Sequence, residues 1–184
     1  MSRKYKFGDK AQLHFVTYAT VGWIDLFTRN EYKRVITDSL QHCMAKKGLD
    51  VYAWCIMTNH IHLIISSRDK PLEDILRDHK RHTSETLRDA VKRNAGESRR
   101  EWMLELFTRA GNANGNNNSF QLWQQHNRPI ELYSREVILQ KLAYIHNNPV
   151  AAGFVEKPED WMWGSARTYA GIDAILEGLI LIEP

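Results

Sequence analysis

An apolar run interrupted by two histidines, one residue apart, constrains the fold of this chain most strongly. The run covers residues 57–65 and reads MTNHIHLII. If it is a β-strand, successive side chains alternate between the two faces of a sheet, so His60 and His62 project together while Ile61 and Leu63 pack on the other face. Two neutral imidazoles held in this way are half of a metal site. Hydrogen-bonded or surface histidines are the more frequent outcome for an isolated His-x-His pattern.

Strands are predicted on both sides of this run. Residues 13–20 are aromatic and β-branched, which is typical of a strand, and residues 50–57 predict a second strand that turns tightly into the histidine strand, 60–67. Residues 120–125 predict a fourth strand, and residues 129–132 a short connection after it. The histidines therefore lie on an interior strand.

Two helices are predicted between these strands. The first follows a capping box formed by Thr28 and Glu31 and stops at Gly48. The second begins at Pro71 and has an apolar side and a basic side. A basic helix face is either solvated or turned toward phosphates, and the pattern leaves both open.

A third helix follows the fourth strand. Ser134 caps it, and we expect it to end at about Asn148 because Pro149 disfavours the helical conformation of the residue before it. On this helix Tyr144 and Asn148 are four residues apart and share one face. A tyrosine and an amide thus point together, although a tyrosine at the edge of a core is commoner than a catalytic one.

The order of these elements is βαββαβ followed by one helix. It predicts an α+β fold: a ferredoxin-like sandwich with an antiparallel sheet, helices on one face and a C-terminal active-site helix. We expect residues 1–184 to form one domain. Residues 94–119 contain an Asn- and Gly-rich stretch and predict a mobile loop. Residues 154–184 predict an extension that packs on the domain or on a partner.

Composition excludes several classes of protein. The chain is 43% hydrophobic and 26% charged, with a formal net charge of +3, and it has no apolar run of membrane-spanning length. Its first residues lack the apolar core of a secretory signal, so we expect a cytoplasmic protein. The two cysteines, Cys43 and Cys55, fall at apolar positions and are expected to be reduced and buried.

The histidine strand and the third helix fit one reaction. The amide oxygen of Asn148 would complete a metal site with His60 and His62, leaving open positions for phosphate oxygens. Tyr144, one helical turn away, would attack the phosphorus and form a phosphotyrosine that keeps the energy of the broken ester. The DNA strand could then be rejoined without ATP.

The residues 58–63 (TNHIHL) and 144–153 (YIHNNPVAAG) together closely resemble the single-tyrosine HUH transposases, the IS200-like superfamily, and are most similar to its REP-associated branch. The resemblance covers the chain from the first strand to about Tyr169. It implies a transposase or nickase that cuts single-stranded DNA near hairpins and leaves a 5′-phosphotyrosyl link and a free 3′-hydroxyl. DNA, single-stranded or in hairpins, is the expected partner.

The resemblance also implies roles for four residues. Tyr144 matches the nucleophile, His60 and His62 match the histidine pair, and Asn148 matches the third metal ligand, which is a glutamine in some relatives. The family implies Mg²⁺ or Mn²⁺ as cofactor. The ligands themselves favour zinc, nickel or manganese, because magnesium prefers oxygen ligands throughout.

Contacts to DNA are expected from basic residues near these motifs and on the second helix. Bases could stack on Trp123 or Trp163, although burial in the core is the commoner fate of a tryptophan. The candidate phosphate contacts are Arg77, Lys80, Arg81, Arg88, Arg128 and Lys141.

Two other functions stay open at this point. One is a domesticated protein that binds hairpin DNA without cutting it. The other is a metal hydrolase that uses bound water and needs a carboxylate near the histidines, for which Glu131 and Asp50 are the nearest candidates. The apolar tail at residues 172–182 favours a homodimer.

Overall fold

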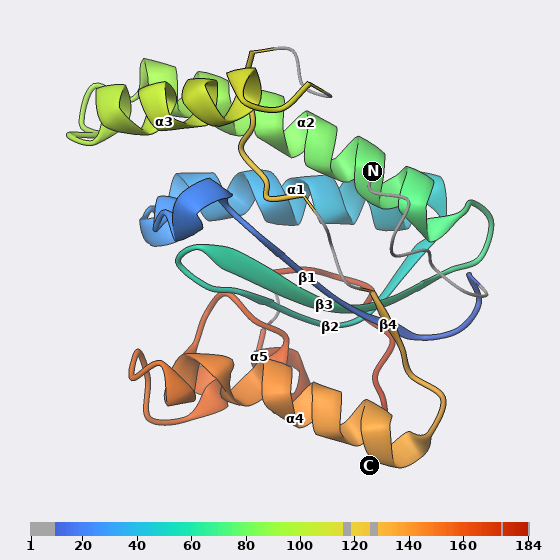
Figure 1. The fold of residues 1–184 in the computed structure, drawn as a ribbon. Helices are drawn as coiled ribbons and strands as arrows, with labels where there is room; N and C mark the ends of the chain where they lie inside the picture. The colour runs from blue at the N-terminus through green and yellow to red at the C-terminus, as the bar shows by residue number, and fades with distance from the viewer. Residues whose placement is uncertain (1–9, 116–118, 126–128, 174, 184) are drawn as a thin grey trace.

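A four-stranded antiparallel sheet in the order β2-β3-β1-β4 forms the centre of the chain (Figure 1). The structure is a computed structural model that describes residues 10–115, 119–125, 129–173 and 175–183. The strand order is that of a ferredoxin-like sandwich, and the predicted α+β fold is confirmed. The strands are β1 (His14–Ala19), β2 (Leu49–Ile56), β3 (His60–Ser67) and β4 (Ile130–Glu131).

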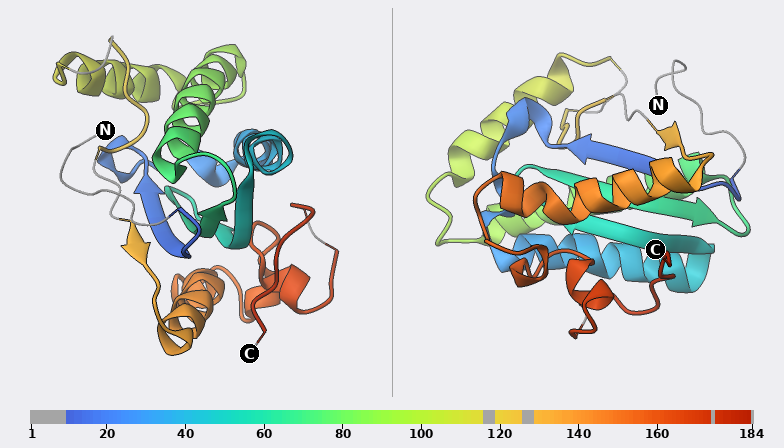
Figure 2. Two further views of the ribbon diagram at one scale, coloured as in Figure 1. Left: turned by 90° about the vertical axis from the view of Figure 1, so that its right-hand side faces the viewer. Right: turned by 90° about the horizontal axis from the view of Figure 1, so that it is seen from below.

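Helices cover both faces of this sheet (Figures 1 and 2). On one face lie α1 (Asn30–Lys47) and α2 (Leu72–Arg93), with α3 (Arg100–Asn112) packed against α2. On the other face lie α4 (Arg135–Ala151) and the short α5 (Ala166–Tyr169). Seen from the α4 side, α4 runs lengthwise along the strands (Figure 2). Three 3-10 turns complete the described elements: η1 (Val21–Trp23), η2 (Leu26–Thr28) and η3 (Pro158–Asp160).

The side chains of β3 alternate between two hydrophobic cores. Ile61, Leu63 and Ile65 are buried under α1 and α2, whereas Ile64 is buried on the α4 face. His62 also belongs to the α4 face, where it stacks on Phe15. The predicted alternation of side chains along the histidine strand is therefore correct. The two imidazoles lie between the sheet and α4.

The fourth strand was predicted in the wrong segment. Ile130–Glu131 forms β4, where a connection was expected, and residues 120–125 contribute only an isolated bridge between Trp123 and Thr20. Leu122 and Trp123 are neighbours in sequence and both are buried. A strand with one solvated face would alternate, so this segment instead wraps the end of β1 with both side chains turned into the core.

A helix occupies much of the segment that was expected to be a loop. Within residues 94–119, α3 covers Arg100–Asn112 and buries Met103, Phe107 and Gly111, which recur every four residues. This spacing is helical. The Asn- and Gly-rich stretch that suggested a loop begins only at the end of α3, and residues 116–118 of it lie outside the described residues.

Two helix ends differ from their predictions. Arg29 takes the N-cap position of α1 and no side chain caps the helix, so the expected capping box does not form. Its two members bind elsewhere: Thr28 accepts a hydrogen bond from Arg99, and Glu31 accepts one from Asn94. The end of α4 also differs, because the helix continues past Pro149 to Ala151; the proline removes only one backbone donor so close to the helix end.

The C-terminal segment packs on its own domain. It lies along the exposed edge of β2, where the Ile56 amide donates to the Trp163 carbonyl (2.8 Å) and the Ile180 amide donates to the Val51 carbonyl (3.0 Å). Leu176 is buried in the core beneath α1. Covering an edge strand in this way blocks its pairing with another chain.

Cys43 and Cys55 are free and buried, as predicted. None of the helices in the described part of the chain has the length and hydropathy that a bilayer-crossing helix needs.

Candidate active site between β3 and α4

His60 and His62 project from β3 toward α4 with their ring centroids 4.6 Å apart. β3 starts at His60 because a tight hairpin ends there: the Met57 amide donates to the His60 carbonyl at 2.9 Å. The hairpin also anchors to the segment after β1, since the Thr20 amide donates to the Asn59 carbonyl at 2.9 Å. The position of the imidazole pair is thus fixed by the hairpin and by the sheet.

Each imidazole is oriented by a contact at its Nδ1 atom. His60 Nδ1 lies 2.7 Å from Asn59 Oδ1, and His62 Nδ1 lies 2.7 Å from Thr17 Oγ1. Because an amide oxygen can only accept, His60 Nδ1 donates its proton to Asn59 and the lone pair lies on Nε2. Thr17 is the direct cross-strand partner of His62 on β1. Outer contacts of this kind fix the ring and tautomer of metal-binding histidines.

Residues of α4 meet the imidazole pair. Asn148 Nδ2 lies 3.3 Å from His62 Nε2, and the Asn148 side chain also hydrogen-bonds to His60. The Tyr144 ring lies 5.2 Å from the His62 ring, centroid to centroid, at 72°. The structure therefore brings all four predicted site residues together, and all come from one chain.

Apolar contacts hold α4 in this position. Ile145 is fully buried against Phe15 and Ile64 of the sheet, with Leu142 packed beside it. Ser134 accepts a hydrogen bond from the Val137 amide at 3.3 Å and caps the helix as predicted. Because the packing stripe of α4 is anchored to the sheet, its polar residues beside that stripe come to lie over the histidines.

The surroundings keep both imidazoles neutral. Burial, together with the nearby His60 and Lys141, lowers the pKa of His62 to about 3. Burial also lowers the pKa of His60, and the hydrogen bond with Asn148 opposes this shift. Neutral imidazoles are the form that binds metal ions, so both Nε2 atoms can act as ligands at neutral pH.

The side chains at this junction fit a divalent metal ion. Two imidazole nitrogens and one amide oxygen form a mixed nitrogen and oxygen ligand set, which suits manganese or zinc better than magnesium. Across the described residues, no three His, Cys, Asp or Glu side chains are grouped closely enough to hold a metal. Asn148 would supply the third ligand: its Nδ2 lies 3.3 Å from His62 Nε2, and turning the amide over would bring its Oδ1, the metal-binding atom, to that place.

Comparison with known proteins identifies the family. The family model for IS200-like transposases matches residues 10–110, which is more than half of the chain. The chain belongs to the IS200-like transposase family. The matched residues include both histidines of the site but end before α4, so the family model does not reach Tyr144 or Asn148.

Two solved structures resemble the chain. The chain resembles a REP-associated tyrosine transposase solved with a bound REP hairpin: TM-score 0.65, 17% identity, 100% of this chain and 95% of that one covered. It also resembles a proposed transposase from Deinococcus radiodurans R1 (TM-score 0.47, 16% identity, 80% and 95% covered). No curated protein is significantly similar. At 17% identity the first likeness establishes the fold alone, and that fold is the predicted one.

The carboxylates considered for a water-using hydrolase lie away from the imidazole pair of this IS200-like transposase. Glu131 pairs with His14 at the start of β1, whereas His60 pairs with Ala19 at its end. The five residue steps from His14 to Ala19 span about 16 Å of strand, and the three steps from His14 to Thr17, the partner of His62, span about 10 Å. Asp50 pairs near the far end of β3. The hydrolase hypothesis therefore lacks the general base that was suggested for it.

Of the predicted DNA contacts that lie in the described part of the chain, Lys141 is the closest to the nucleophile candidate. Its Nζ lies 5.6 Å from the centroid of the Tyr144 ring and 5.0 Å from that of the Phe15 ring. Arg77, Arg81 and Arg88 are on α2, on the opposite face of the sheet, and are not brought to the site (Figure 1). Arg128 lies outside the described residues.

Lys80, also on α2, points into the protein. Its Nζ lies 5.5 Å from the centroid of the Tyr18 ring and 3.3 Å from the Gln124 carbonyl oxygen, to which it donates. Burial lowers the pKa of Lys80 to about 8. Of the predicted basic contacts that the structure describes, Lys80 is thus the one with the least access to a phosphate.

The tryptophans divide into core and surface residues. Trp123 and Trp163, considered for base stacking, are both buried in the core. Trp23 is 56% exposed and touches His60, with ring centroids 5.8 Å apart. Trp23, and Thr17 and Asn59, which orient the histidines, were not predicted from the sequence. Only the position of Asn59 directly before His60 offered a signal.

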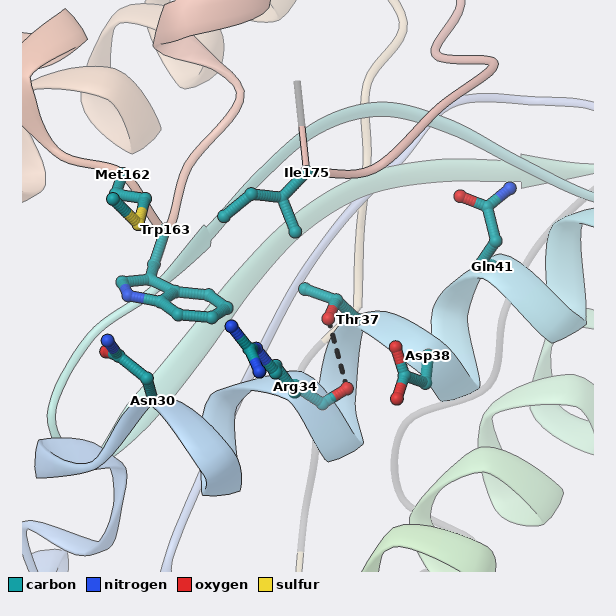
Figure 3. A pocket seen from close by; sticks show the side chains of 8 residues that line it. All are labelled: Asn30, Arg34, Thr37, Asp38, Gln41, Met162, Trp163 and Ile175. Atoms are coloured by element: carbon teal, nitrogen blue, oxygen red, sulfur yellow. Dashed lines mark hydrogen bonds between the residues drawn. The ribbon is translucent and has the colours of Figure 1, made fainter. Parts of the chain in front are cut away.

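A separate hollow lies between α1 and the C-terminal segment (Figure 3). Its volume is about 360 Å³, and the Trp163 side chain faces Arg34 and Asn30 across it. Its other lining residues are Thr37, Asp38, Gln41, Met162 and Ile175. None of the four candidate active-site residues lines this hollow.

Proposed function

We propose that this protein is a metal-dependent transposase or nickase that cuts and rejoins single-stranded DNA through a 5′-phosphotyrosine. The observation that carries the proposal is the meeting of α4 and β3: Asn148 bonds to His62, and Tyr144, one turn earlier, lies against the same imidazole. A nucleophile and an electrophilic site are thereby held within a few ångströms of one another. Membership of the IS200-like transposase family supports DNA as the substrate.

In the cutting step, the Tyr144 hydroxyl oxygen attacks the scissile phosphorus. The Tyr144 hydroxyl gives up its proton, a bond forms between its oxygen and phosphorus, and the bond from phosphorus to the 3′-oxygen breaks. The 3′-oxygen takes up a proton and leaves as a hydroxyl, so no net proton is gained or lost. The new phosphodiester conserves the energy of the old one. Attack by a 3′-hydroxyl on the phosphotyrosine then rejoins DNA and releases Tyr144.

His60, His62 and Asn148 would hold the divalent ion; the family implies Mg²⁺ or Mn²⁺, and of these two the imidazole ligands favour Mn²⁺. When bound, such an ion acts as a Lewis acid on a phosphate oxygen. Asn59 and Thr17 hold the imidazoles with their Nε2 atoms toward α4. Phe15 and Ile145 pack together and hold α4 against the sheet, so that Tyr144 would stay close to a bound scissile phosphate.

Hairpin DNA is the substrate that we propose. The REP-associated transposase of the same fold was solved with a REP hairpin, which supports this choice. Lys141 is placed to meet a backbone phosphate beside Tyr144. Arg77, Arg81, Arg88 and Arg128 remain proposed contacts for the more distant part of the DNA.

The decisive experiment detects a covalent adduct. The protein is mixed with labelled hairpin DNA carrying single-stranded flanks and with Mg²⁺ or Mn²⁺, and adducts are separated on a denaturing gel. We expect an adduct with the wild type and none with Tyr144→Phe, which should still bind the DNA. Tyr133→Phe is the matched control, because Tyr133 is a surface tyrosine, 79% exposed, that is not among the site residues.

The same experiment distinguishes a nickase from a protein that only binds hairpin DNA. Hairpin binding with no adduct in any divalent metal would favour a domesticated DNA-binding protein over a nickase.

A homodimer is a further proposal: Ile175, Ile180 and Leu181 of the tail stay partly exposed and could meet a second copy. Analytical ultracentrifugation tests it, and the chemistry does not depend on it, since one chain supplies every site residue.

A further inference from the structure

Trp23 has an unusual backbone conformation. Its φ is +54°, in the left-handed region that a bulky side chain rarely adopts, and it directly follows Gly22 with φ +66°. Trp23 ends η1, the turn that follows β1. Strained residues of this kind persist only where their surroundings enforce them, and they are concentrated at functional sites.

The turn that enforces this conformation is tied to the active site. The Trp23 amide donates to the Thr20 carbonyl at 3.1 Å, and its carbonyl accepts from Asn59 Nδ2 at 3.3 Å. Asn59 Oδ1 is also the acceptor that orients His60. One amide side chain therefore positions both a metal-ligand candidate and the backbone of Trp23.

Contacts within the protein stabilise the Trp23 ring only weakly. It is 56% exposed, and the ring contact that the structure gives it is with His60, at 5.8 Å and 70°. Burial therefore does not account for the strain. The backbone of Trp23 is strained and held by hydrogen bonds, yet its ring stays open to solvent. Such a ring is suited to stacking on another flat group.

Among the residues that the structure describes, Trp23 and Tyr144 are the two exposed aromatic residues that touch the histidine pair. Tyr144 contacts His62, and Trp23 contacts His60, the other member of the pair. A phosphate at the imidazoles would be flanked by two nucleotides, and the base of one of them would come within reach of the Trp23 ring. Tryptophan stacks on any base through its π-face and tolerates differences in sequence.

We propose that Trp23 is a stacking platform for a base that flanks the scissile phosphate. The inference rests on the proposed function and adds to it a binding residue that neither the family match nor the histidine motif assigns. The platform would hold the single strand extended at the histidine pair, so that the phosphorus faces Tyr144. It would act on the positioning of DNA and not on the metal.

The test uses the full chain and a defined oligonucleotide. A library of hairpins with randomised single-stranded flanks is bound to Tyr144→Phe protein, and the tightest binder is resynthesised with 2-aminopurine at each flank position in turn. Stacking on tryptophan quenches 2-aminopurine. We expect one position near the cleavage site to be quenched, and this quenching to disappear in a Trp23→Asn variant.

Trp23→Asn is chosen because asparagine tolerates a positive φ. It should fold with a melting temperature at or above that of the wild type while its affinity for the hairpin falls about tenfold or more, as expected for the loss of one stacked base. Trp23→Phe should restore part of both signals. Trp102→Ala is the matched control, since Trp102 is 53% exposed but lies on α3, across the sheet.

The outcomes separate the two proposals. If the wild type forms an adduct while Trp23→Asn keeps full affinity and quenching, the platform is overturned and the proposed function stands. If the wild type binds hairpins but forms no adduct, while quenching depends on Trp23, the platform stands without the nickase. An equal loss of affinity in Trp102→Ala would overturn the platform, because the effect would not be specific to the site.

Discussion

Tyr144 lies edge-on to His62, with ring centroids 5.2 Å apart and ring planes at 72°. The two residues come from α4 and β3, which are far apart in the sequence and meet on one face of the sheet. Each brings a partner: Asn148 follows Tyr144 by one helical turn, and His60 precedes His62 on the same side of the strand. The chemistry proposed for this protein depends on this meeting.

Removing the amide of Asn148 should weaken metal binding. We expect Asn148→Ala to lower the affinity for Mn²⁺ at least tenfold, since one of three protein ligands is lost. Asn148→Asp should bind Mn²⁺ more tightly than Asn148→Ala, because a carboxylate is a hard, charged oxygen ligand. Isothermal titration with Mn²⁺ measures both. Asn147→Ala is the control, because Asn147 bonds to the Ala143 carbonyl of its own helix, and an equal effect there would refute the ligand role.

Removing the outer partner of His60 should have a similar but indirect effect. Without the amide of Asn59, His60 Nδ1 loses its acceptor and the ring is free to turn, so Asn59→Ala should lower Mn²⁺ affinity by about 10- to 100-fold. Metal-dependent adduct formation should recover partly at high Mn²⁺, since the ligands themselves remain. An unchanged metal titration in Asn59→Ala would contradict the orienting role.

Local patterns explain which parts of the fold were predictable. The place of β3 was predicted correctly, with its start at His60 and its end near Ser67, because the hairpin and the alternation of the histidines with their apolar neighbours are local signals. The stop of α1 at Gly48 was also correct, since Gly48 has φ +72° and ends the helix. β4 was missed because it has only two residues, and its pairing with β1 is a tertiary property.

The candidate site was predictable in part for the same reason. The imidazole pair follows from strand periodicity, and Tyr144 with Asn148 from helical periodicity, but only the resemblance to a family joined the two halves. Thr17 could not be found, because its contact with His62 requires the register of β1 against β3. Trp23 could not be found either, since its exposure and its positive φ are set by the turn it occupies.

The buried carboxylate of Glu97 should make stability depend on pH. Although burial acts to raise its pKa, hydrogen bonds from Arg99 and Arg29 lower the pKa of Glu97 from 4.5 to about 2. The ionised form therefore stabilises the fold fully above about pH 4.5, and this stabilisation is lost as the pH falls toward 2. We expect Glu97→Gln to cost about 2 kcal/mol at pH 7, from lost hydrogen bonds to charged groups.

Urea denaturation at pH 7, 4 and 3 measures this effect. The difference in unfolding free energy between wild type and Glu97→Gln should be largest at pH 7 and shrink steadily at pH 4 and pH 3. Glu101→Gln serves as the control, because Glu101 is 93% exposed and its closest ion-pair distance, to Arg100, is 3.9 Å. A difference that stays constant between pH 7 and pH 3 would show that the charge of Glu97 is not the cause.

Ile145 should couple the stability of α4 to activity. Its side chain is fully buried against the sheet, next to Tyr144, so Ile145→Ala should lower the free energy of unfolding by about 3 kcal/mol through lost burial and a cavity. A loosened α4 would displace both Tyr144 and Asn148, so adduct formation and Mn²⁺ affinity should both fall. Ile172→Ala, at a position 39% exposed, should change both much less. Equal losses of adduct formation in the two variants would show that the packing of α4 against the sheet does not control the position of Tyr144.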